Sequence, residues 1–551
     1  MESVQENKEI SREARVFANK TARSIAEIQQ SVNNMADVLV FLEVLGYDDR
    51  TAKRNGFENL YELAKYVYNF VDAYDDDDKS HTSNSFAMEV PSTKKRLAES
   101  LSMIFPWLGS LVLLFLTGVS LWMAWDLPAS VTTAFLAGVF LGLVVTEGLL
   151  QNYNRLFSFY YSQTNIGEIK RSIERSYVLA GVILSGTVAL LYGVSELANI
   201  PLELAMIAAV STVTISLHRI SYVIMYALKK LTHIGISYAI ALGVLAGVFF
   251  LAPDAIPDVT VRYFAALGSA FAVLSSFAMY HHYKIMGKSS TSIVAKNAPH
   301  FYSPLTVNDN TITSRFGVQL WECLPYFMYG TFYFILLFAD RAISWFFNPV
   351  SVTAANGTIL PLSFNSIYHI GADLALLVIL PVAIMQYVIT SPIYALVHNR
   401  AIVLKVSENK KIDWFLQYSY HKLMAASIAV SVAGALILNL VAPAIIIGYL
   451  GGSEVSMRIL TFASAGAVFL SVFAANGVFM IFLGKVKALA QVSLAAAFIV
   501  IVGGTFLAQY GGFENIVIAY LAATVFAGMA STVAMRVAIR KAASLLFARY
   551  I

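Results

Sequence analysis

The sequence predicts an all-α, polytopic membrane protein with about twelve transmembrane helices in two lobes of six, plus a soluble helical hairpin at the N-terminus. Three observations lead to this fold class: the composition, the spacing of long apolar segments and the distribution of basic residues between them. Of the 551 residues, 58% are hydrophobic and only 13% carry charge, and the mean hydropathy is +0.66. The charged share is about half that of an average soluble domain.

The apolar segments are long enough to cross a bilayer, which takes about 20 residues of helix. A long polar joint at 281–323 divides them into six and six, as in transporters built from two lobes. The two halves share no visible repeat at the level of residues, so this division depends on the segment count alone. The predicted spans are 104–125, 131–150, 178–197, 203–227, 234–252, 262–280, 324–347, 371–397, 423–450, 457–483, 486–508 and 515–537.

The basic residues predict the orientation of the spans. The joints after odd-numbered spans contain only two basic residues, Arg262 and Arg458. The joints after even-numbered spans and both chain ends are rich in Lys and Arg. Because cytoplasmic loops carry the excess of basic residues, both termini are expected on the cytoplasmic side of a cell (plasma) membrane. The same pattern accounts for the net charge of +4, so membrane lipid is the expected partner and nucleic acid is not.

Residues 1–80 are predicted to form a cytoplasmic helical domain. An apolar stripe with alternating spacings of three and four predicts an amphipathic helix of about 30 residues, and it comprises Ile25, Ile28, Val32, Met35, Leu39 and Leu42. A second helix follows the break at Gly46, with an apolar face of Phe57, Leu60, Leu63, Ala64, Val67 and Val71. We interpret the pair as a helical hairpin that is either a docking module or a self-contained cap.

The remaining domain boundaries follow from the composition. The acidic run Asp75–Asp78 and the Ser/Thr-rich stretch after it are typical of a solvated linker, placed at 81–97. The first lobe is predicted at 98–280, a cytoplasmic joint at 281–323 and the second lobe at 324–551. Asn356-Gly357-Thr358 on the largest outer loop matches a glycosylation sequon, which is a weak signal alone.

Motifs of soluble enzymes are missing from the sequence. It has no GxxxxGK[ST], HExxH, CxxC or GxSxG pattern, so we predict no ATP-driven pump, no catalytic residues, no cofactor and no metal site. The largest outer loop, near 348–370, has no acidic residue, which argues against a membrane glycosyltransferase. Cys323 is the single cysteine and is interpreted as a small buried residue.

The seventh span contains the clearest candidates for a substrate path, Asp340 and Arg341. Ionisable groups inside apolar spans are costly and are functional hypotheses by default. Tyr333, Asp340 and Ser344 share one face of the helix, whereas adjacent positions point about 100° apart, so Asp340 and Arg341 are not expected to face each other. The alternative is a structural pair near the membrane surface, with Arg341 reaching toward the headgroups and Trp345 in the aromatic belt.

Two further candidates lie near cytoplasmic ends of the first lobe. Glu147 either pairs with Arg155, lines the inner mouth of a path, or is an interfacial charge. Arg219 is predicted either to bind an anionic phosphate or to reach the headgroups.

The eighth span carries a different signal, two prolines. Pro381 and Pro392 flank Gln386 and Tyr387, and prolines in a span indicate either a broken helix that lines a cavity or a plain kink. Asp373 starts this span and is interpreted as a helix N-terminal charge.

The seventh span also resembles a known family. The Tyr329-Gly330 step, the aromatic run after it, Asp340-Arg341 and Trp345 resemble the exopolysaccharide exporter family typified by the Pel polysaccharide transporter. That family belongs to the multidrug, oligosaccharidyl-lipid and polysaccharide flippase superfamily. The resemblance covers about residues 98–548. It implies a V-shaped pair of six-helix bundles, alternating access for a polysaccharide or lipid-linked glycan, and a cavity reached by Tyr333, Asp340 and Arg341. Tyr329 is a further candidate for the substrate path.

Four functions remain in order of preference. The first is a glycan exporter or flippase, driven by an ion gradient or by polymer synthesis in a partner, a cytoplasmic glycosyltransferase docked on residues 1–80. Few cations lie inside the spans, which favours a cationic or neutral glycan over an anionic one. The second is a membrane scaffold that recruits a cytoplasmic synthase, the third a small-molecule or drug antiporter of the same superfamily, and the weakest a membrane glycosyltransferase.

Overall fold

The computed structural model describes residues 11–28, 35–44, 47–77, 90–162, 166–286, 316–354, 357, 359–403 and 409–545. The chain divides into two compact units. The first consists of Met1–Val90 with Asn297–Thr306 and Pro392–Ile412, and the second of Pro91–Lys296, Val307–Ser391 and Asp413–Ile551.

The N-terminal part of the first unit contains four helices where a hairpin was predicted. They are α1 (Arg12–Ile28), α2 (Met35–Val44), α3 (Asp49–Arg54) and α4 (Leu60–Asp77). Residues 29–34, including Val32 of the predicted stripe, lie outside the described residues. The helix α4 continues through Asp75–Asp77, which the sequence had suggested as linker.

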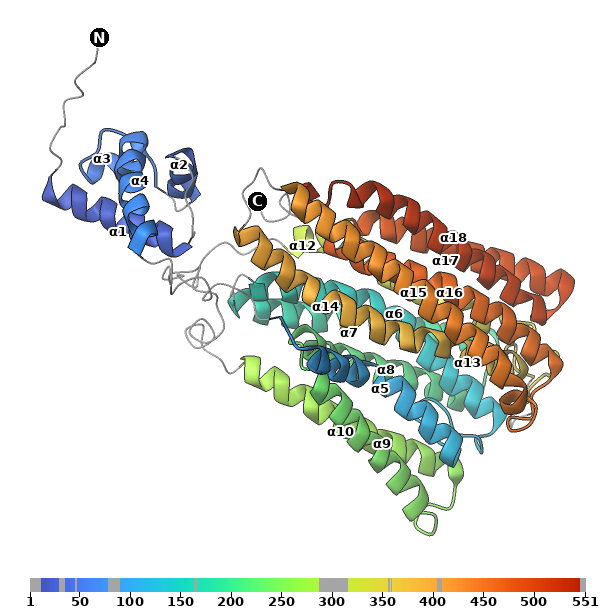
Figure 1. Cartoon of the computed structure of the whole chain (residues 1–551). Helices are drawn as coiled ribbons and strands as arrows, with labels where there is room; N and C mark the ends of the chain where they lie inside the picture. The colour runs from blue at the N-terminus through green and yellow to red at the C-terminus, as the bar shows by residue number, and fades with distance from the viewer. Residues whose placement is uncertain are drawn as a thin grey trace. The chain divides into compact units, whose positions relative to one another are not determined.

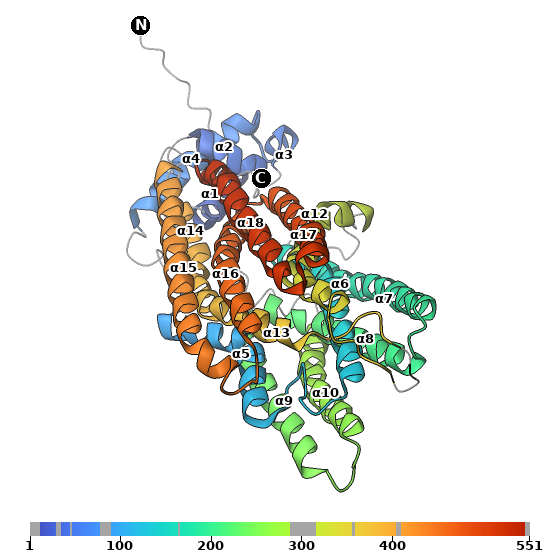
Figure 2. The same ribbon diagram turned by 90° about the vertical axis from the view of Figure 1, so that its right-hand side faces the viewer.

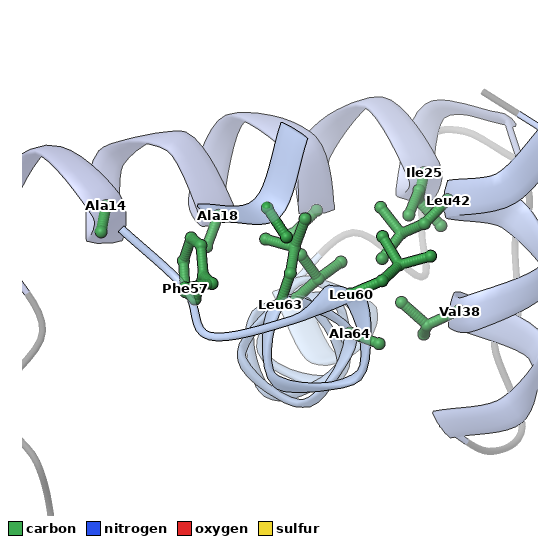
Figure 3. Packing of buried hydrophobic residues seen from close by; sticks show 12 residues of the cluster. Ala14, Ala18, Ile25, Val38, Leu42, Phe57, Leu60, Leu63 and Ala64 are labelled. Atoms are coloured by element: carbon green, nitrogen blue, oxygen red, sulfur yellow. The ribbon is translucent and has the colours of Figure 1, made fainter. Parts of the chain in front are cut away.

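The four helices enclose a core of their own. Figure 3 shows Ala14 and Ala18 of α1 on one side of this core, Leu63 of α4 in its middle and Leu42 of α2 on the other side. All four side chains are almost completely buried. The four helices therefore share one hydrophobic core built from their own residues.

The spans lie in the second unit, apart from the end of the eighth span and the start of the ninth. Twelve helices among the described residues are long and apolar enough to cross a membrane, which confirms the predicted number and the all-α class. Figure 1 shows them running side by side. They are α5 (Thr93–Thr117), α6 (Ala129–Ser162), α7 (Ile166–Leu197), α8 (Leu202–Ala227), α9 (Leu231–Leu251), α10 (Val259–Met286), α12 (Phe316–Phe346), α13 (Ser366–Ala375) with α14 (Ile379–Val403), α15 (Asn409–Ile446), α16 (Glu454–Phe482), α17 (Val486–Gly511) and α18 (Ile516–Ile539).

The two groups of six spans repeat one packing scheme. In the first lobe α5 packs on α9, α6 on α8, and α10 on both α8 and α9. In the second lobe α12 packs on α17, α13 on α16, and α18 on both α16 and α17, which are the same pairs six spans later. Figure 2, viewed along many of the helices, shows α16, α17 and α18 grouped together. The repeat that the sequence does not show is therefore present in the helix contacts.

The lobes meet where α6 crosses α12. At Gly148 of α6 an added Cβ would lie 2.5 Å from Thr331 Oγ1, and at Gly330 of α12 it would lie 2.8 Å from the carbonyl oxygen of Glu147. Each helix thus presents a glycine to the other, and the two backbones approach more closely than larger residues allow.

The first span ends earlier than the sequence predicted. The helix α5 stops at Thr117 because Gly118 adopts a left-handed conformation with φ of 75°. Residues 119–124 then form a short loop with a β-bridge between Val119 and Ala124. Leu121 in this loop is 1% exposed, so this connection, which the basic residues predict on the outer side of the membrane, is buried. We call residues 118–125 the buried outer loop.

The eighth span is interrupted. The helices α13 and α14 are separated by a 3₁₀ turn, η1, at Leu376–Val378, and Pro381 lies in the first turn of α14. Pro392, by contrast, lies inside α14. Only Pro381 of the two prolines therefore marks a break in the helix, and this break shapes the site described next.

Candidate functional site

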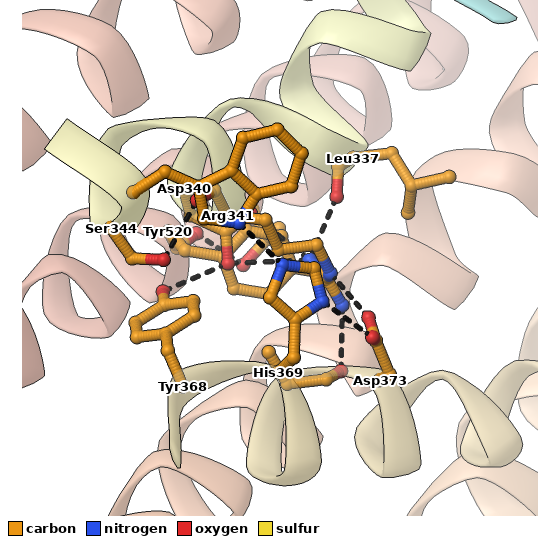
Figure 4. A network of polar contacts seen from close by, with 11 residues as sticks. Leu337, Asp340, Arg341, Ser344, Tyr368, His369, Asp373 and Tyr520 are labelled. Atoms are coloured by element: carbon orange, nitrogen blue, oxygen red, sulfur yellow. Dashed lines mark hydrogen bonds and ion pairs between the residues drawn. The ribbon is translucent and has the colours of Figure 1, made fainter. Parts of the chain in front are cut away.

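Asp340 and Arg341 of α12 lie at the centre of a buried polar network in the second lobe (Figure 4). Both side chains are at most 1% exposed, and a nitrogen of Arg341 lies 3.0 Å from Asp340 Oδ1. The sequence prediction that these neighbours do not face each other was wrong, because the long guanidinium folds back along its helix to donate to the Leu337 carbonyl oxygen at 2.9 Å. Tyr368 of α13 donates its hydroxyl hydrogen to Asp340 at 2.9 Å.

Asp373 of α13 joins this network from the opposite helix. The Arg341 Nε donates to Asp373 Oδ1 at 2.6 Å, and another guanidinium nitrogen donates to the Ala372 carbonyl oxygen at 2.7 Å. The side chain of Asp373 is 50% exposed, in contrast to its completely buried partners. Asp373 is therefore the member of the network that is open to its surroundings.

The second oxygen of Asp373 is held by an aromatic pair. His369 Nδ1 lies 2.7 Å from Asp373 Oδ2, and the indole N–H of Trp345 donates to His369 Nε2 at 2.8 Å. Since an indole nitrogen can only donate, Nε2 must accept, and His369 is neutral with its proton on Nδ1. Two carboxylates then face one guanidinium among the charged residues described in this network, which leaves one negative charge uncompensated.

A cavity of about 200 Å³ lies between the lobes at this carboxylate. Its walls come from α5, the buried outer loop and α6 on one side and from α12, α13, η1 and α14 on the other. Among the described residues that line it, Asp373 carries the formal charge, and the aromatic members are Trp107, Trp122, Phe140, Phe338 and Phe364 together with His369. The cavity is an apolar, aromatic chamber with one half-exposed carboxylate.

Trp122 reaches the cavity because the buried outer loop is held in place. The Ser110 hydroxyl of α5 accepts the Leu121 N–H at 3.1 Å, and the Tyr263 hydroxyl of α10 donates to the Ser120 carbonyl oxygen at 3.1 Å. The ring of Trp122 then stacks on Trp107, with centroids 5.9 Å apart. The loop forms the outer wall of the chamber.

The predicted residues Glu147 and Arg219 pair with each other. Arg219 of α8 forms an ion pair with Glu147 of α6, and both side chains are less than a fifth exposed. Arg219 also donates to the Leu143 carbonyl oxygen and to Thr146 Oγ1, each at 2.9 Å, and its guanidinium lies over Phe334. This pair binds two spans of the first lobe, and Arg155 instead lies near the ring of Tyr326.

The polar stripe predicted on the seventh span has separate surroundings at each position. Ser344 is buried and donates to the Arg341 carbonyl oxygen at 2.7 Å. Tyr333 stacks on Phe473 of α16 with centroids 6.1 Å apart, and Tyr329 packs edge-on against the same ring. These tyrosines connect α12 to α16 inside the second lobe.

Gln386 and Tyr387 of α14 are adjacent in sequence but make different contacts. Gln386 is buried and donates to Ser427 Oγ and to the Ser471 carbonyl oxygen, both at 3.1 Å. The Tyr387 hydroxyl donates to Glu99 of α5 at 2.8 Å. Since α5 belongs to the first lobe, Tyr387 ties the two lobes together.

A second tie between the lobes lies at the opposite end of α5. The Tyr449 hydroxyl, just after α15, donates to the Phe115 carbonyl oxygen at 2.8 Å, and its ring packs edge-on against Trp125. Contacts between the lobes thus exist at both ends of α5, and the α5 residues that line the chamber, from Trp107 to Leu114, lie between these two contacts along the helix.

Comparison with known proteins identifies the fold. No protein-family model and no curated protein matches the sequence. An outward-facing multidrug resistance MATE family transporter of the MOP superfamily matches with a TM-score of 0.57 at 13% identity, covering 84% of this chain and 99% of that chain. The chain has the fold of these transporters.

Two other solved structures agree. An inward-facing MATE family transporter matches with a TM-score of 0.52 at 11% identity, over 84% of this chain and 97% of that chain. A MOP superfamily transporter from Pyrococcus furiosus, described as having a binding pocket of reverse polarity, matches with a TM-score of 0.57 at 13% identity, over 84% and 99%. The fold agrees with the flippase superfamily that the seventh span resembles; membership of the exopolysaccharide exporter family within it stays a prediction.

Sequence reasoning did not select Asp373, His369 and Trp345 as one group. Asp373 was interpreted as a helix N-terminal charge, and Trp345 as a member of the aromatic belt. Two signals in the sequence pointed to the region: Pro381, which marks the break after α13, and the i, i+4 spacing of His369 and Asp373, which places both on one helix face.

Proposed function

We propose that this protein is a membrane transporter that exports a polysaccharide or lipid-linked glycan by alternating access, and that Asp373 binds a cationic group of the cargo. One observation carries the proposal: a chamber between two lobes of a transporter fold exposes a carboxylate whose charge its partners do not balance. An uncompensated charge in an apolar setting is costly, and a bound cation removes that cost.

Cargo chemistry follows from the chamber walls. Tryptophan rings such as Trp107 and Trp122 offer flat faces for stacking and for attracting cations. An amino sugar combines both requirements, since it has a ring that stacks and an ammonium group that pairs with Asp373. The buried cations Arg341 and Arg219 are already paired with carboxylates, which disfavours an anionic glycan.

The apolar walls also favour a second candidate, an antiporter of small organic cations. An aromatic chamber with one carboxylate suits a lipophilic ammonium ion as well as an amino sugar. The two candidates differ in size and in the number of polar groups that need partners. Measurements with both cargoes on the same variant separate them.

The test is Asp373→Asn, compared with Asp254→Asn, a carboxylate on an exposed outer connection. Surface polysaccharide in the producing cell and efflux of ethidium are measured at matched protein level. Glycan export predicts loss of surface polysaccharide in Asp373→Asn alone, whereas the antiporter predicts loss of ethidium efflux. If both activities persist in Asp373→Asn, the carboxylate has no role in transport and the proposal fails.

The termini and the N-terminal unit complete the proposal. We place both termini on the cytoplasmic side of the cell membrane. There, residues 1–80 dock a cytoplasmic glycosyltransferase. The support is the hydrophobic core that α1–α4 share. Deleting residues 1–80 distinguishes the exporter from a scaffold, because a scaffold loses partner recruitment while a docked exporter loses both recruitment and export. Retention of both contradicts the docking role.

A further inference from the structure

Trp345 contributes more to the site than packing. Its indole N–H donates to His369 Nε2 at 2.8 Å, and His369 Nδ1 lies 2.7 Å from Asp373 Oδ2. Trp345 is 4% exposed and His369 5% exposed, so water does not replace either contact. Figure 4 shows His369 beside the carboxylate of Asp373, both on α13.

We propose that Trp345 is a positioning residue that keeps His369 uncharged and thereby keeps Asp373 free to bind a cation. The inference rests on the proposed function, because it concerns the same carboxylate. It gives a specific role to His369, which lines the chamber, and to Trp345, which contacts His369.

The protonation state of His369 determines what each of its ring nitrogens can do. A protonated imidazole carries a hydrogen on both nitrogens and needs an acceptor for each. With Trp345 in place, a hydrogen on Nε2 would face the indole N–H, so two donors would meet at 2.8 Å. The neutral form avoids this clash and satisfies both contacts. Trp345 therefore selects the neutral ring by occupying its acceptor nitrogen.

The charge of the site depends on that selection. With neutral His369, the carboxylates of Asp340 and Asp373 share one cation, Arg341. A protonated His369 would supply the second cation and balance the network internally. Asp373 would then have no remaining charge for a cargo or ion, and affinity for a cation would fall.

The other groups around His369 do not change this count. Its ring stacks with uncharged Phe140 of α6 and packs on Phe364, with centroids 6.0 and 4.5 Å away. The charged groups are Asp373 on its own helix and Asp340 and Arg341 on α12. The neutral hydroxyls of Tyr368 and of Tyr520 of α18 lie at the far side of the network, toward Asp340 and Arg341.

The experiment compares cation binding at two pH values. Tetraethylammonium is the probe, because its charge is permanent and cannot titrate, and calorimetry gives its half-saturation concentration on the purified full chain. The variant is Trp345→Phe, which keeps an aromatic ring beside Phe140 but donates no hydrogen bond. The measured quantity is the ratio of half-saturation concentrations at pH 5.5 and pH 7.5, which bracket the titration of imidazoles.

In Trp345→Phe this ratio is expected to exceed the wild-type ratio by about tenfold, since one competing proton changes affinity by up to about tenfold per pH unit. In Trp345→Phe/His369→Gln the ratio returns to the wild-type value, because Gln does not titrate. A structural role of Trp345 would weaken binding equally at both pH values. Equal ratios in wild type and Trp345→Phe would therefore overturn the inference.

A second measurement does not depend on any ligand. Nitrogen NMR of ¹⁵N-histidine-labelled protein, with His369→Gln identifying the signal, is expected to show one protonated and one bare ring nitrogen at pH 5.5. Two protonated nitrogens in the wild type would refute the selection by Trp345. Failure of tetraethylammonium to bind wild type would instead refute the cation site at Asp373, and this result is distinguishable because Asp373→Asn would then match wild type.

Discussion

The two lobes each contain a buried ionic group, and the groups differ in charge balance. In the first lobe one carboxylate, Glu147, meets one guanidinium, Arg219, and both are largely buried. In the second lobe Asp340 and Asp373 share Arg341, and Asp373 is half exposed. The balanced pair has nothing left to offer a ligand, so it acts as a link between α6 and α8.

This difference shows which property separates a site from a structural contact in a membrane protein. Both lobes have ionisable residues inside their spans, so the presence of such a residue does not distinguish a binding site from a structural contact. The charge balance does, because a neutral ionic group is satisfied by its own partners, whereas a group with a net charge requires a counter-charge from outside. The next four predictions test that distinction, from the largest expected effect to the smallest.

Replacement of Arg341 by Gln is expected to cause the largest loss of stability. Buried Asp340 and half-exposed Asp373 would lose their only described cation, and breaking a buried ion pair such as Asp340–Arg341 typically costs about 3–5 kcal/mol. The thermal midpoint of the purified full chain in detergent reports the loss. Arg458→Gln is the matched control, because Arg458 is 49% exposed and its pair with Glu514 is worth at most about 1 kcal/mol. Equal shifts in both variants would contradict the central position of Arg341.

A double-mutant cycle then compares the two ionic groups. Glu147→Gln and Arg219→Gln each leave one charge unpaired, so their combination is expected to recover about 0.5–3 kcal/mol relative to the sum of the single effects. The cycle of Asp373→Asn with Arg341→Gln is expected to recover less, since Asp340 stays buried and unpaired. Stability is measured as before. Similar coupling energies in the two lobes would contradict the proposed difference in charge balance between the two ionic groups.

The crossing of α6 and α12 provides the third prediction, which concerns how firmly the compared lobes are joined. Gly330→Ala places a methyl group 2.8 Å from the Glu147 carbonyl oxygen, and overpacking of this kind costs about 1–3 kcal/mol. Gly186→Ala in α7, where an added Cβ meets nothing within 4 Å, is the control. It should be neutral or stabilising because alanine favours helix. A neutral Gly330→Ala would mean that the crossing gives way easily.

The smallest effect concerns Asp48, a carboxylate outside the membrane spans that contrasts with Asp373. Hydrogen bonds from the Thr51 side chain and backbone, at 2.7 and 2.8 Å, lower the pKa of Asp48 at the start of α3. A lowered pKa in the folded state contributes stability above the unfolded pKa of about 3.9, and this is lost as pH falls through the folded value. Asp48→Ala should speed amide hydrogen exchange in α3 slightly at pH 6. An exchange rate equal to that of the wild type would contradict the role of Asp48 as the N-cap of α3.

The sequence predicted the class and number of spans well, because hydropathy and basic residues report directly on the bilayer. It failed at the first span, which was drawn through residue 125. The buried outer loop contains Val119, Leu121 and Trp122 and is as apolar as the helix before it, so hydropathy cannot separate the two. Gly118 was the available signal, as a left-handed helix end.

The site was predicted in part, and for a clear reason. Asp340 and Arg341 are conspicuous because they are charged residues inside an apolar run. Their partners come from α13, some 30 positions later, and no periodicity in one segment reports on contacts with another. For the same reason the sequence could not show that Glu147 and Arg219 pair, or that Asp373 remains half exposed.

The way the buried outer loop is held has a consequence for the order of biosynthesis. Two side chains of the first lobe hydrogen-bond to the loop. Ser110 is synthesised before the loop, but Tyr263 belongs to the sixth span and is made some 140 residues after Ser120. Spans enter the bilayer as they emerge from the ribosome, so the loop has no second anchor until α10 arrives. The outer wall of the chamber is therefore one of the last parts of the first lobe to take its final position, and substitution of Tyr263 should act on maturation of the chain more than on the insertion of any span.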